Sequence, residues 1–319
     1  MRKIIGIGET VFDIIFKNEQ PISGRPGGSV YNALISLGRA GLEPIFISEI
    51  GADRIGDVIK DYLKDNHINT EYIRSCGGKS PLALAFLDEK QNADYLFYKD
   101  YSSDRLDFVT PIIDEDDIIV IGSYYAINPV LREKITDLLE FAKDRKAIIY
   151  YDVNYRKSHA HESGFLMPNI LENFEYADII KGSDEDFVNI FDQEGADLVY
   201  KEHVEFYCKN FLYTQGADGL TAFSAGRKKK YAANNITPVS TVGAGDNFNA
   251  GIIYGLCKYD IRREDLCNGT IPNETWDKII QCAIDFSAFA CTTLENYISK
   301  EFAQEYNKKI DVELEAEQK

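Results

Sequence analysis

The feature that most constrains the fold of this chain is the alternation of short apolar runs with longer segments of helical periodicity. The runs are rich in Ile, Val, Tyr and Phe, which is typical of strands buried on both faces of a parallel sheet. They lie at residues 3–8, 44–50, 118–121, 147–151, 179–180 and 211–213. The helical patterns lie at residues 29–39, 55–63, 129–141, 185–191, 197–208, 244–257 and 275–293. This order predicts a doubly wound, mostly parallel α/β sheet with helices on both faces.

Two stretches, 11–26 and 81–101, interrupt the alternation because they show strand and turn patterns without helices. In the second stretch, Leu82 and Leu84 alternate with smaller residues at period two, and a polar turn is expected at 88–92. We expect both stretches to form a small β lid that projects from the α/β core. The alternative that the pattern leaves open is a peripheral hairpin without a function.

Length and charge limit the class of protein. The chain has 319 residues, 45% of them hydrophobic, which suffices for one large domain with an elaboration or for two medium domains. A net charge of −17 argues against a nucleic-acid partner, because phosphate backbones attract surfaces rich in Lys and Arg. No apolar segment approaches the ~20 residues of a membrane span. The six dispersed cysteines contain no C-x-x-C pair and predict neither zinc nor disulfides. We expect a cytoplasmic protein.

Two charged segments have structural rather than functional interpretations. The basic run at 227–230 is expected to be an exposed turn or an edge strand. The C-terminal residues 308–319 lack an apolar stripe, so this tail is expected to fray. Ser29, at the start of the first long helical pattern, is the expected N-cap of that helix.

Three motifs resemble known sites but lack a required part. Residues 6–8 begin a dinucleotide fingerprint that fails at Val11, where glycine is needed. Residues 78–80 imitate the end of a P-loop, but the segment after them has a strand pattern. His159 and His161 could bind a metal ion, yet no third ligand is evident nearby, and a surface loop is the favoured interpretation.

Residues 241–246 carry the strongest chemical signal. Small residues at Gly243, Ala244 and Gly245 precede a long helical pattern, and the start of a helix leaves several backbone N–H groups without partners. Together with the helix dipole, these groups form an anion site that needs no lysine. Asp246 follows directly. It could accept the proton of a second substrate's hydroxyl, or it could merely stabilise the helix start.

At this point the sequence resembles the PfkB family of ribokinase-like sugar kinases. Residues 241–246 are similar to its second signature, Asp-Thr-x-Gly-Ala-Gly-Asp, and residues 27–38 followed by 50–56 are similar to its first. Further landmarks of the family stand in its order between residues 4 and 256. These are Gly8-Glu9 followed by Asp13, a D-x-N-x-R at 152–156 as in the fructokinase branch, 181–186 and 214–219. The resemblance implies one kinase domain over 1–319, with an α/β core and a β lid.

The resemblance also implies the roles of individual residues. Asp246 would be the base, and the backbone of Gly243, Ala244, Gly245 and Asp246 would hold the transferring phosphate. The sugar would be bound by Asp13, Gly27, Gly28, Asn32, Tyr98, Lys99 and Arg156. Lys181, Ser183 and Asp186 would support the ATP phosphates, with Asp186 holding Mg²⁺ through water. Thr214, Gly216 and Gly219 would line the nucleotide site.

Departures from the family pattern occur at three places. Ser240 stands where many members have an aspartate that helps to bind potassium, and residues 291–296 lack a glycine usual there. We therefore expect weak or absent activation by a monovalent cation. Lys99 stands where fructokinase-like proteins often have arginine, and an ammonium cannot reproduce the two-pronged contacts of a guanidinium.

The leading hypothesis is an ATP-dependent sugar kinase that acts on a primary hydroxyl, with fructose as the first candidate. Ribose, a 2-keto-3-deoxy sugar acid, a sugar phosphate or a nucleoside remain open as substrates. A hypothesis from another class is a non-catalytic protein that binds a sugar or a nucleotide on the same fold. A nicotinamide-dependent oxidoreductase rests only on residues 6–8. Pairing of two copies through the lid is expected from the resemblance alone.

Overall fold

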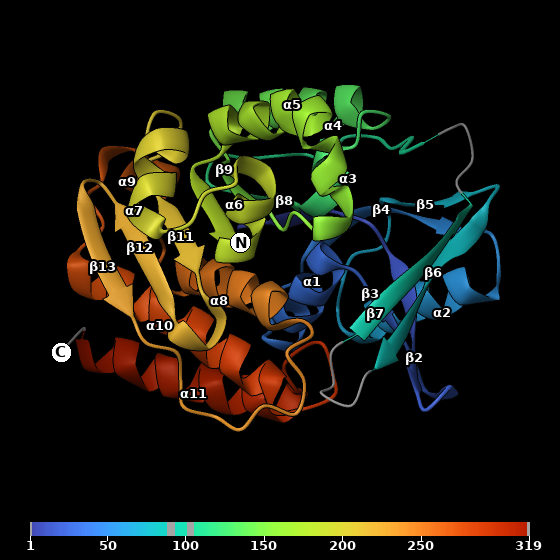
Figure 1. The fold of residues 1–319 in the computed structure, drawn as a ribbon. Coiled ribbons are helices and arrows are strands. Elements are labelled where there is room, and N and C mark those ends of the chain that lie inside the picture. The colour runs from blue at the N-terminus through green and yellow to red at the C-terminus, as the bar shows by residue number, and fades with distance from the viewer. Residues whose placement is uncertain (1, 88–92, 101–104, 318–319) are drawn as a thin grey trace.

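The computed structural model describes residues 2–87, 93–100 and 105–317. Its core is a nine-stranded sheet in the order β13-β12-β11-β10-β9-β8-β1-β4-β5 (Figure 1). The strands are β1 (Ile4–Ile7), β4 (Ile45–Gly51), β5 (Ile73–Cys76), β8 (Ile118–Gly122), β9 (Ile148–Asp152), β10 (Ile179–Ser183), β11 (Phe211–Thr214), β12 (Leu220–Ser224) and β13 (Arg227–Tyr231). Neighbours from β11 to β5 pair in parallel, whereas β12 and β13 are antiparallel. The predicted doubly wound sheet is confirmed.

Helices cover both faces of this sheet (Figure 1). One face is covered by α1 (Ser29–Arg39), α2 (Arg54–Asp65), α8 (Ala244–Lys258), α9 (Arg263–Asn268), α10 (Asn273–Cys291) and α11 (Lys300–Glu317). The other is covered by α3 (Ser123–Ile127), α4 (Arg132–Asp144), α5 (Ser163–Tyr176), α6 (Asp184–Phe191) and α7 (Ala196–Val199). The sheet is thus buried on both faces, as the continuous Ile, Val and Tyr runs of its strands require.

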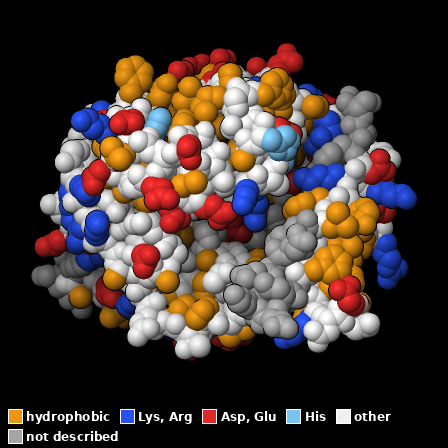
Figure 2. All heavy atoms as spheres, viewed as in Figure 1, with side chains coloured by type: hydrophobic (Ala, Val, Ile, Leu, Met, Phe, Trp, Pro, Cys, Tyr) orange, Lys and Arg blue, Asp and Glu red, His pale blue; other side chains and the backbone are white. Residues whose placement is uncertain are grey.

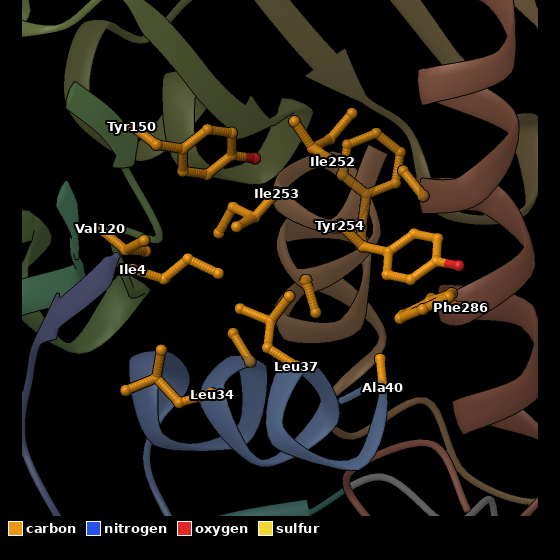
Figure 3. Close-up of a cluster of buried hydrophobic side chains, with 14 of the residues drawn as sticks. Ile4, Leu34, Leu37, Ala40, Val120, Tyr150, Ile252, Ile253, Tyr254 and Phe286 are labelled. Atoms are coloured by element: carbon orange, nitrogen blue, oxygen red, sulfur yellow. The ribbon is translucent and has the colours of Figure 1, made fainter. Parts of the chain in front are cut away.

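The packing of α1 against α8 brings the N-terminal ends of these two helices together. Leu34 and Leu37 of α1 point toward Ile253 of α8, under side chains from the sheet (Figure 3). On the other side of α8, Tyr254 stacks obliquely on Phe286 of α10, with ring centroids 5.2 Å apart. The buried apolar contacts therefore fix the starts of α1 and α8 relative to each other.

A second, four-stranded sheet projects from the core in the order β3-β2-β6-β7 (Figure 1). Its strands are β2 (Val11–Lys17), β3 (Gln20–Gly27), β6 (Lys79–Leu87) and β7 (Ala93–Asp100). The two stretches that interrupted the alternation therefore do form a separate small sheet, the lid. The expected turn at 88–92 and position 101 of the expected lid lie outside the described residues.

The small sheet is tied to the end of β4 at its base. The Asp53 carboxylate accepts hydrogen bonds from the Ser80 amide and hydroxyl, both at 2.8 Å. The Thr10 hydroxyl, just before β2, donates to the Glu49 carbonyl at 2.8 Å. The Glu49 carboxylate in turn pairs with Arg105 at 2.8 Å, and both of these side chains are buried. Thr10, just before the first lid strand, and Arg105, after the last lid strand, are thus both bonded to Glu49 of the core.

Several local predictions were wrong. The C-terminal residues from 308 do not fray in the described part: α11 continues to Glu317 because Ile310 is buried and the Lys258 ammonium lies 2.8 Å from Asp311. Positions 318–319 lie outside the described residues. Ser29 is not the cap of α1, because Gly28 occupies that position. Helix α5, which contains Pro168, was not predicted.

Other expectations hold or change in detail. The basic run forms the edge strand β13, as one of its two interpretations predicted. The helical pattern at 197–208 splits into α7 and a π-helical turn at Tyr200–Val204. Within the described residues, no helix is long and apolar enough to cross a membrane.

Candidate active site

The site lies where the starts of α1 and α8 meet the carboxyl ends of the central strands. β1 is the strand at which the chain order reverses, since β4 lies on one side and β8 on the other. Ligands of open α/β sheets bind outside the carboxyl ends at such a switch point. The surface is hollowed in this region, between the core and the apolar side chains of the lid (Figure 2). Acidic side chains gather along the margin of the hollow (Figure 2).

Asp246, in the first turn of α8, is held by two residues of α1. The Ser29 hydroxyl donates to Oδ1 of Asp246 at 2.8 Å, and the Asn32 amide donates to Oδ2 at 2.8 Å. Burial raises the pKa of Asp246 above its ordinary value, whereas the bonds from Asn32 and Ser29 oppose that rise. A carboxylate with a raised pKa, fixed at both oxygens, is suited to accept a proton at a defined place.

The residues before Asp246 form the expected turn, but the Ala244 amide, which was expected to face an anion, is used within the turn. Gly243 has a φ of 82°, and a Cβ on it would lie 2.6 Å from the Asn296 carbonyl oxygen, so only glycine fits. The Ala244 amide donates to the Thr241 carbonyl at 3.2 Å and so is used within the turn. The amides of Gly245 and Asp246, in the first turn of α8, have no acceptor within the helix. Gly245 is exposed, and its amide is therefore accessible to an anion.

A buried network lies directly behind this turn. The Lys181 ammonium would be 3.2 Å from a Cβ on Gly245, and it pairs with Asp152 at 2.9 Å. The other Asp152 oxygen accepts a hydrogen bond from Asn249 of α8 at 2.7 Å. Lys181, in the middle of β10, is in direct register with Asp152, the last residue of the neighbouring parallel strand β9. The Lys181 ammonium thus lies beside the predicted phosphate site, as expected, but its charge is paired with the Asp152 carboxylate.

Ser183 and Asp186 mainly cap α6. The Asp186 carboxylate accepts hydrogen bonds from the amides of Tyr155 at 2.7 Å and Ser183 at 2.6 Å, and the Ser183 hydroxyl accepts one from the Asp186 amide. Burial raises the pKa of Asp186 to about 6. Because both Asp186 oxygens serve backbone groups, this arrangement does not support a direct contact with Mg²⁺.

The described residues do not by themselves build a magnesium site. Within the described parts of the chain, no group of three or more His, Cys, Asp or Glu side chains is placed to hold a metal ion. His159 instead stacks on Tyr124, with ring centroids 4.1 Å apart. A magnesium ion that arrived with ATP would draw its ligands from phosphate oxygens and water, as it commonly does.

The predicted sugar residues gather on the lid side of Asp246. A Cβ on Gly27 would lie 2.3 Å from an Asp13 carboxylate oxygen, which places the end of β3 directly against Asp13. Gly28 has a φ of 133°, and its Cβ would lie 2.2 Å from the Glu9 carbonyl oxygen. Burial raises the pKa of Asp13 to about 7, while the charge of nearby Arg156 lowers it. The structure thus brings Asp13, Gly27, Gly28 and Arg156 together.

Asn32 bonds to Asp246 through one side-chain atom and leaves the other without a partner among the described residues. Its amide nitrogen is committed to Asp246, whereas its Oδ1 atom is buried and has no hydrogen-bond partner within the part of the chain that the structure describes. A buried carbonyl oxygen without a donor is costly, so a ligand hydroxyl that reached this atom would relieve that cost. This observation supports the predicted contact of Asn32 with a sugar.

Lys99 and Tyr98 lie on β7, the outer strand of the lid. The Lys99 ammonium pairs with the Glu9 carboxylate of the core at 2.8 Å. The Tyr98 side chain is 55% exposed, and no described contact directs it toward Asp246. Lys99, which was predicted to contact the substrate, therefore has its positive charge balanced by the Glu9 carboxylate.

The predicted nucleotide residues lie at the end of β11 and beyond it. Thr214 is in register with Ser183, and its hydroxyl donates to the Gly182 carbonyl at 3.4 Å. Around Gly216, the space that a Cβ would enter is open. Gly219 has a structural reason to be glycine, since its Cβ would lie 2.0 Å from the Tyr231 carbonyl oxygen. Their contact with a nucleotide stays a prediction.

Sequence reasoning missed several residues of the site. Ser29 was assigned to a cap, and Glu9, Asp152 and Asn249 were given no role. For Asp152 a signal existed, because it begins the D-x-N-x-R motif. For Asn249 the sequence contains no such signal, because its contact with Asp152 joins positions 97 residues apart.

With this geometry in place, the class of protein follows from comparison with known families. The model of the pfkB family carbohydrate kinases matches residues 1–301, and the chain belongs to this family of phosphotransferases that act on an alcohol group. A fructokinase of Rhizobium leguminosarum bv. trifolii is 28% identical over 261 residues, which cover 79% of each chain. The 5-dehydro-2-deoxygluconokinase 1 of Bacillus cereus is 29% identical over 248 residues, which cover 72% of this chain and 73% of the relative.

A plant relative is longer than this chain. The probable fructokinase-6, chloroplastic, of Arabidopsis thaliana is 29% identical over 240 residues, and the match spans 72% of this chain but only 62% of that protein. The sequence relatives thus act on more than one sugar, by their names, and do not decide the substrate of this chain.

Solved structures confirm the ribokinase-like fold. The aminoimidazole riboside kinase of Salmonella enterica, complexed with its riboside and an ATP analogue, superposes with a TM-score of 0.80 at 20% identity, covering 97% of this chain and 100% of that one. The fructokinase of Vibrio cholerae O395 with fructose, ADP and calcium ion gives 0.80 at 19% identity, covering 93% and 94%. A double mutant of that fructokinase is known with fructose, ADP and potassium ion, also at 0.80 and 18% identity, covering 93% and 94%.

Proposed function

We propose that this protein transfers the γ-phosphate of ATP to a primary hydroxyl of a free sugar, with fructose as the first candidate. The observation that supports the proposal best is the arrangement of Asp246. It lies in the first turn of α8, next to the exposed Gly245, and is bonded to Asn32, whose Oδ1 has no hydrogen-bond partner among the described residues. One side can hold an anion and the other an alcohol, which are the two reactants of a kinase.

The chain's own residues divide the work in this proposal. Asp246 accepts the proton of the sugar hydroxyl as that oxygen attacks the phosphate. The amides of Gly245 and Asp246, with the dipole of α8, stabilise the negative charge of the transferring group. Lys181 adds a fixed positive charge behind the turn. Asp13, Gly27, Gly28 and Asn32 orient the sugar, and Arg156 lies beside Asp13.

The charge balance favours a neutral sugar over an acid. Lys99, one of the two cations predicted to reach the substrate, is paired with Glu9. Arg156 is exposed and acts on Asp13. An acidic substrate would bring its own carboxylate close to Glu9 and Asp13, at a cost in free energy. A sugar acid is still a second candidate, because the Bacillus cereus relative is named for one.

The direct test is Asp246→Asn, which keeps the shape of the side chain and removes the base. We expect turnover to fall about 10²- to 10⁴-fold, as is typical when a general base is lost, while ATP and sugar still bind. Asp57→Asn is the matched control, because Asp57 is an exposed carboxylate in the first turn of α2. ADP release is measured with fructose, ribose and a 2-keto-3-deoxy sugar acid.

The outcomes separate the competing functions. Undiminished turnover in Asp246→Asn would remove Asp246 from its role. No ADP release from the unmodified protein with any sugar or nucleoside, despite binding of either ligand, would favour a non-catalytic binding protein. The ranking of the acceptors identifies the substrate class. A cytoplasmic location is proposed with the kinase and is not tested by these assays.

A further inference from the structure

Ser29 stands at an unusual junction of lid and core. The lid strand β3 ends at Gly27, Gly28 caps α1, and Ser29 is the first residue of that helix. A serine at a helix start commonly bonds to a nearby backbone amide. Here no side-chain cap bond is made, and the hydroxyl instead reaches Asp246, 217 positions away in the sequence.

The geometry of this junction leaves Ser29 little freedom. At Gly28 a φ of 133° and a Cβ position only 2.2 Å from the Glu9 carbonyl oxygen show that the chain passes close to the segment between β1 and β2. The α1 side chains that follow are buried against α8. The position of the Ser29 hydroxyl is therefore set by the end of the lid strand and by the packing of two helices.

We propose that Ser29 is a positioning residue that acts with Asn32: its hydroxyl fixes the Oδ1 oxygen of Asp246 and so orients the base. The inference rests on the proposed function. A serine hydroxyl has one proton to donate, and here it is committed to the base. Ser29 acts through Asp246 and need not touch the sugar or the phosphate.

The charge around Asp246 makes the bond consequential. Besides Ser29 and Asn32 of α1, the groups that act on Asp246 are Asp152 of β9 and Lys181 of β10, and Asp13 of β2 interacts with it as well. Two of these neighbours are carboxylates and one is an ammonium. A hydrogen bond to the charged form lowers the pKa of a carboxyl group. Loss of the Ser29 hydroxyl thus raises the pKa of Asp246 and reduces the fraction of ionised base at low pH.

The test is the pH dependence of kcat for Ser29→Ala at saturating ATP and sugar, because kcat reports the groups of the substrate complex, whereas the titration of Asp13 in the free enzyme would enter kcat/KM. We expect its acidic limb to move to higher pH by about one unit, the equivalent of one hydrogen bond to a charged group. We expect kcat to fall while KM for ATP stays unchanged. Ser29→Thr keeps the hydroxyl and should restore the limb. Ser163→Ala, at the start of α5, is the matched control and should leave the profile unchanged.

The results for Ser29→Ala and Asp246→Asn together separate the role of Ser29 from the proposed function. An acidic limb that does not move in Ser29→Ala, while Asp246→Asn has lost turnover, overturns the role of Ser29 and leaves the proposed function intact. Retained turnover in Asp246→Asn overturns the proposed function itself. If Ser29→Ala does not fold, Ser29→Cys replaces it, because a thiol of similar size is a weak donor and predicts the same shift.

Discussion

At the scale of single residues, Asp13 has the clearest measurable consequence. Its burial against the end of β3 raises its pKa to about 7, and the nearby charge of Asp246 adds to the rise while Arg156 opposes it. In the unfolded chain, an aspartate titrates near 3.9. The folded state therefore binds a proton more tightly, and Asp13 destabilises the fold progressively as pH rises from about 4 to about 7.

Asp13→Asn removes this dependence. We expect the variant to gain thermal stability over the unmodified protein at pH 8, where the penalty from ionised Asp13 is complete, and to gain clearly less at pH 5, where that penalty has developed only in part. The measurement is the difference in Tm without ligands across this pH range. A difference in Tm that is the same at pH 5 and pH 8 would show that Asp13 keeps an ordinary pKa. Sugar affinity should fall in the same variant.

Single residues also show how far sequence reasoning reaches. The placement of Asp246 at a helix start and of Gly243 in a tight turn followed from local patterns, because a run of small residues directly before a helical pattern is typical of such a turn. Ser29 was misassigned since the capping rule is local, whereas its actual partner comes from α8. The Asp186 carboxylate likewise serves backbone amides that no spacing in the sequence indicates.

At the scale of elements, the loop before α8 packs against the loop after α10. The amides of Val239 and Ser240 both donate to the Cys291 carbonyl, at 2.8 and 3.3 Å. The Ser240 hydroxyl accepts from the Val242 amide at 3.2 Å. A neutral hydroxyl used in this way offers a cation no negative charge, in contrast to the aspartate usual at this position.

We therefore expect weak or absent activation by potassium. The phosphorylation rate should change little between potassium chloride and tetramethylammonium chloride at equal ionic strength. A steep rise in rate as potassium replaces the bulky cation would contradict this expectation. The assay is independent of the sugar's identity, provided that one acceptor supports turnover.

The regular elements were predictable to different degrees. The central strands were found because buried parallel strands are continuous apolar runs, and this signal is local. The extension of α11 to Glu317 was missed because most residues of this helix are polar. Only a few apolar side chains, among them Tyr306 and Ile310, are buried against the core, and they are too few to give a clear helical pattern in the sequence. Helix α5 was missed because Pro168 interrupts the expected pattern.

At the scale of the whole molecule, the small sheet and the nine-stranded sheet meet at the site. The residues proposed to bind the sugar include Asp13 and Gly27 of the lid, and those proposed to act on the phosphate include Gly245 and Lys181 of the core. Closure of the lid over the sugar, which would exclude water, stays a prediction. Pairing of two copies also stays a prediction, for which the half-exposed Leu96 and Tyr98 of β7 offer an apolar surface.

In the proposed reaction, the Asp246 carboxylate stands between a phosphate and an alcohol. A crystal structure of the protein with a non-hydrolysable ATP analogue and the acceptor sugar found in the assay tests it most directly. We expect the γ-phosphate of the analogue at the amides of Gly245 and Asp246, and a sugar hydroxyl within hydrogen-bond distance of the Asp246 carboxylate. Ligands bound away from the start of α8, or a sugar whose hydroxyls all point away from Asp246, would contradict it.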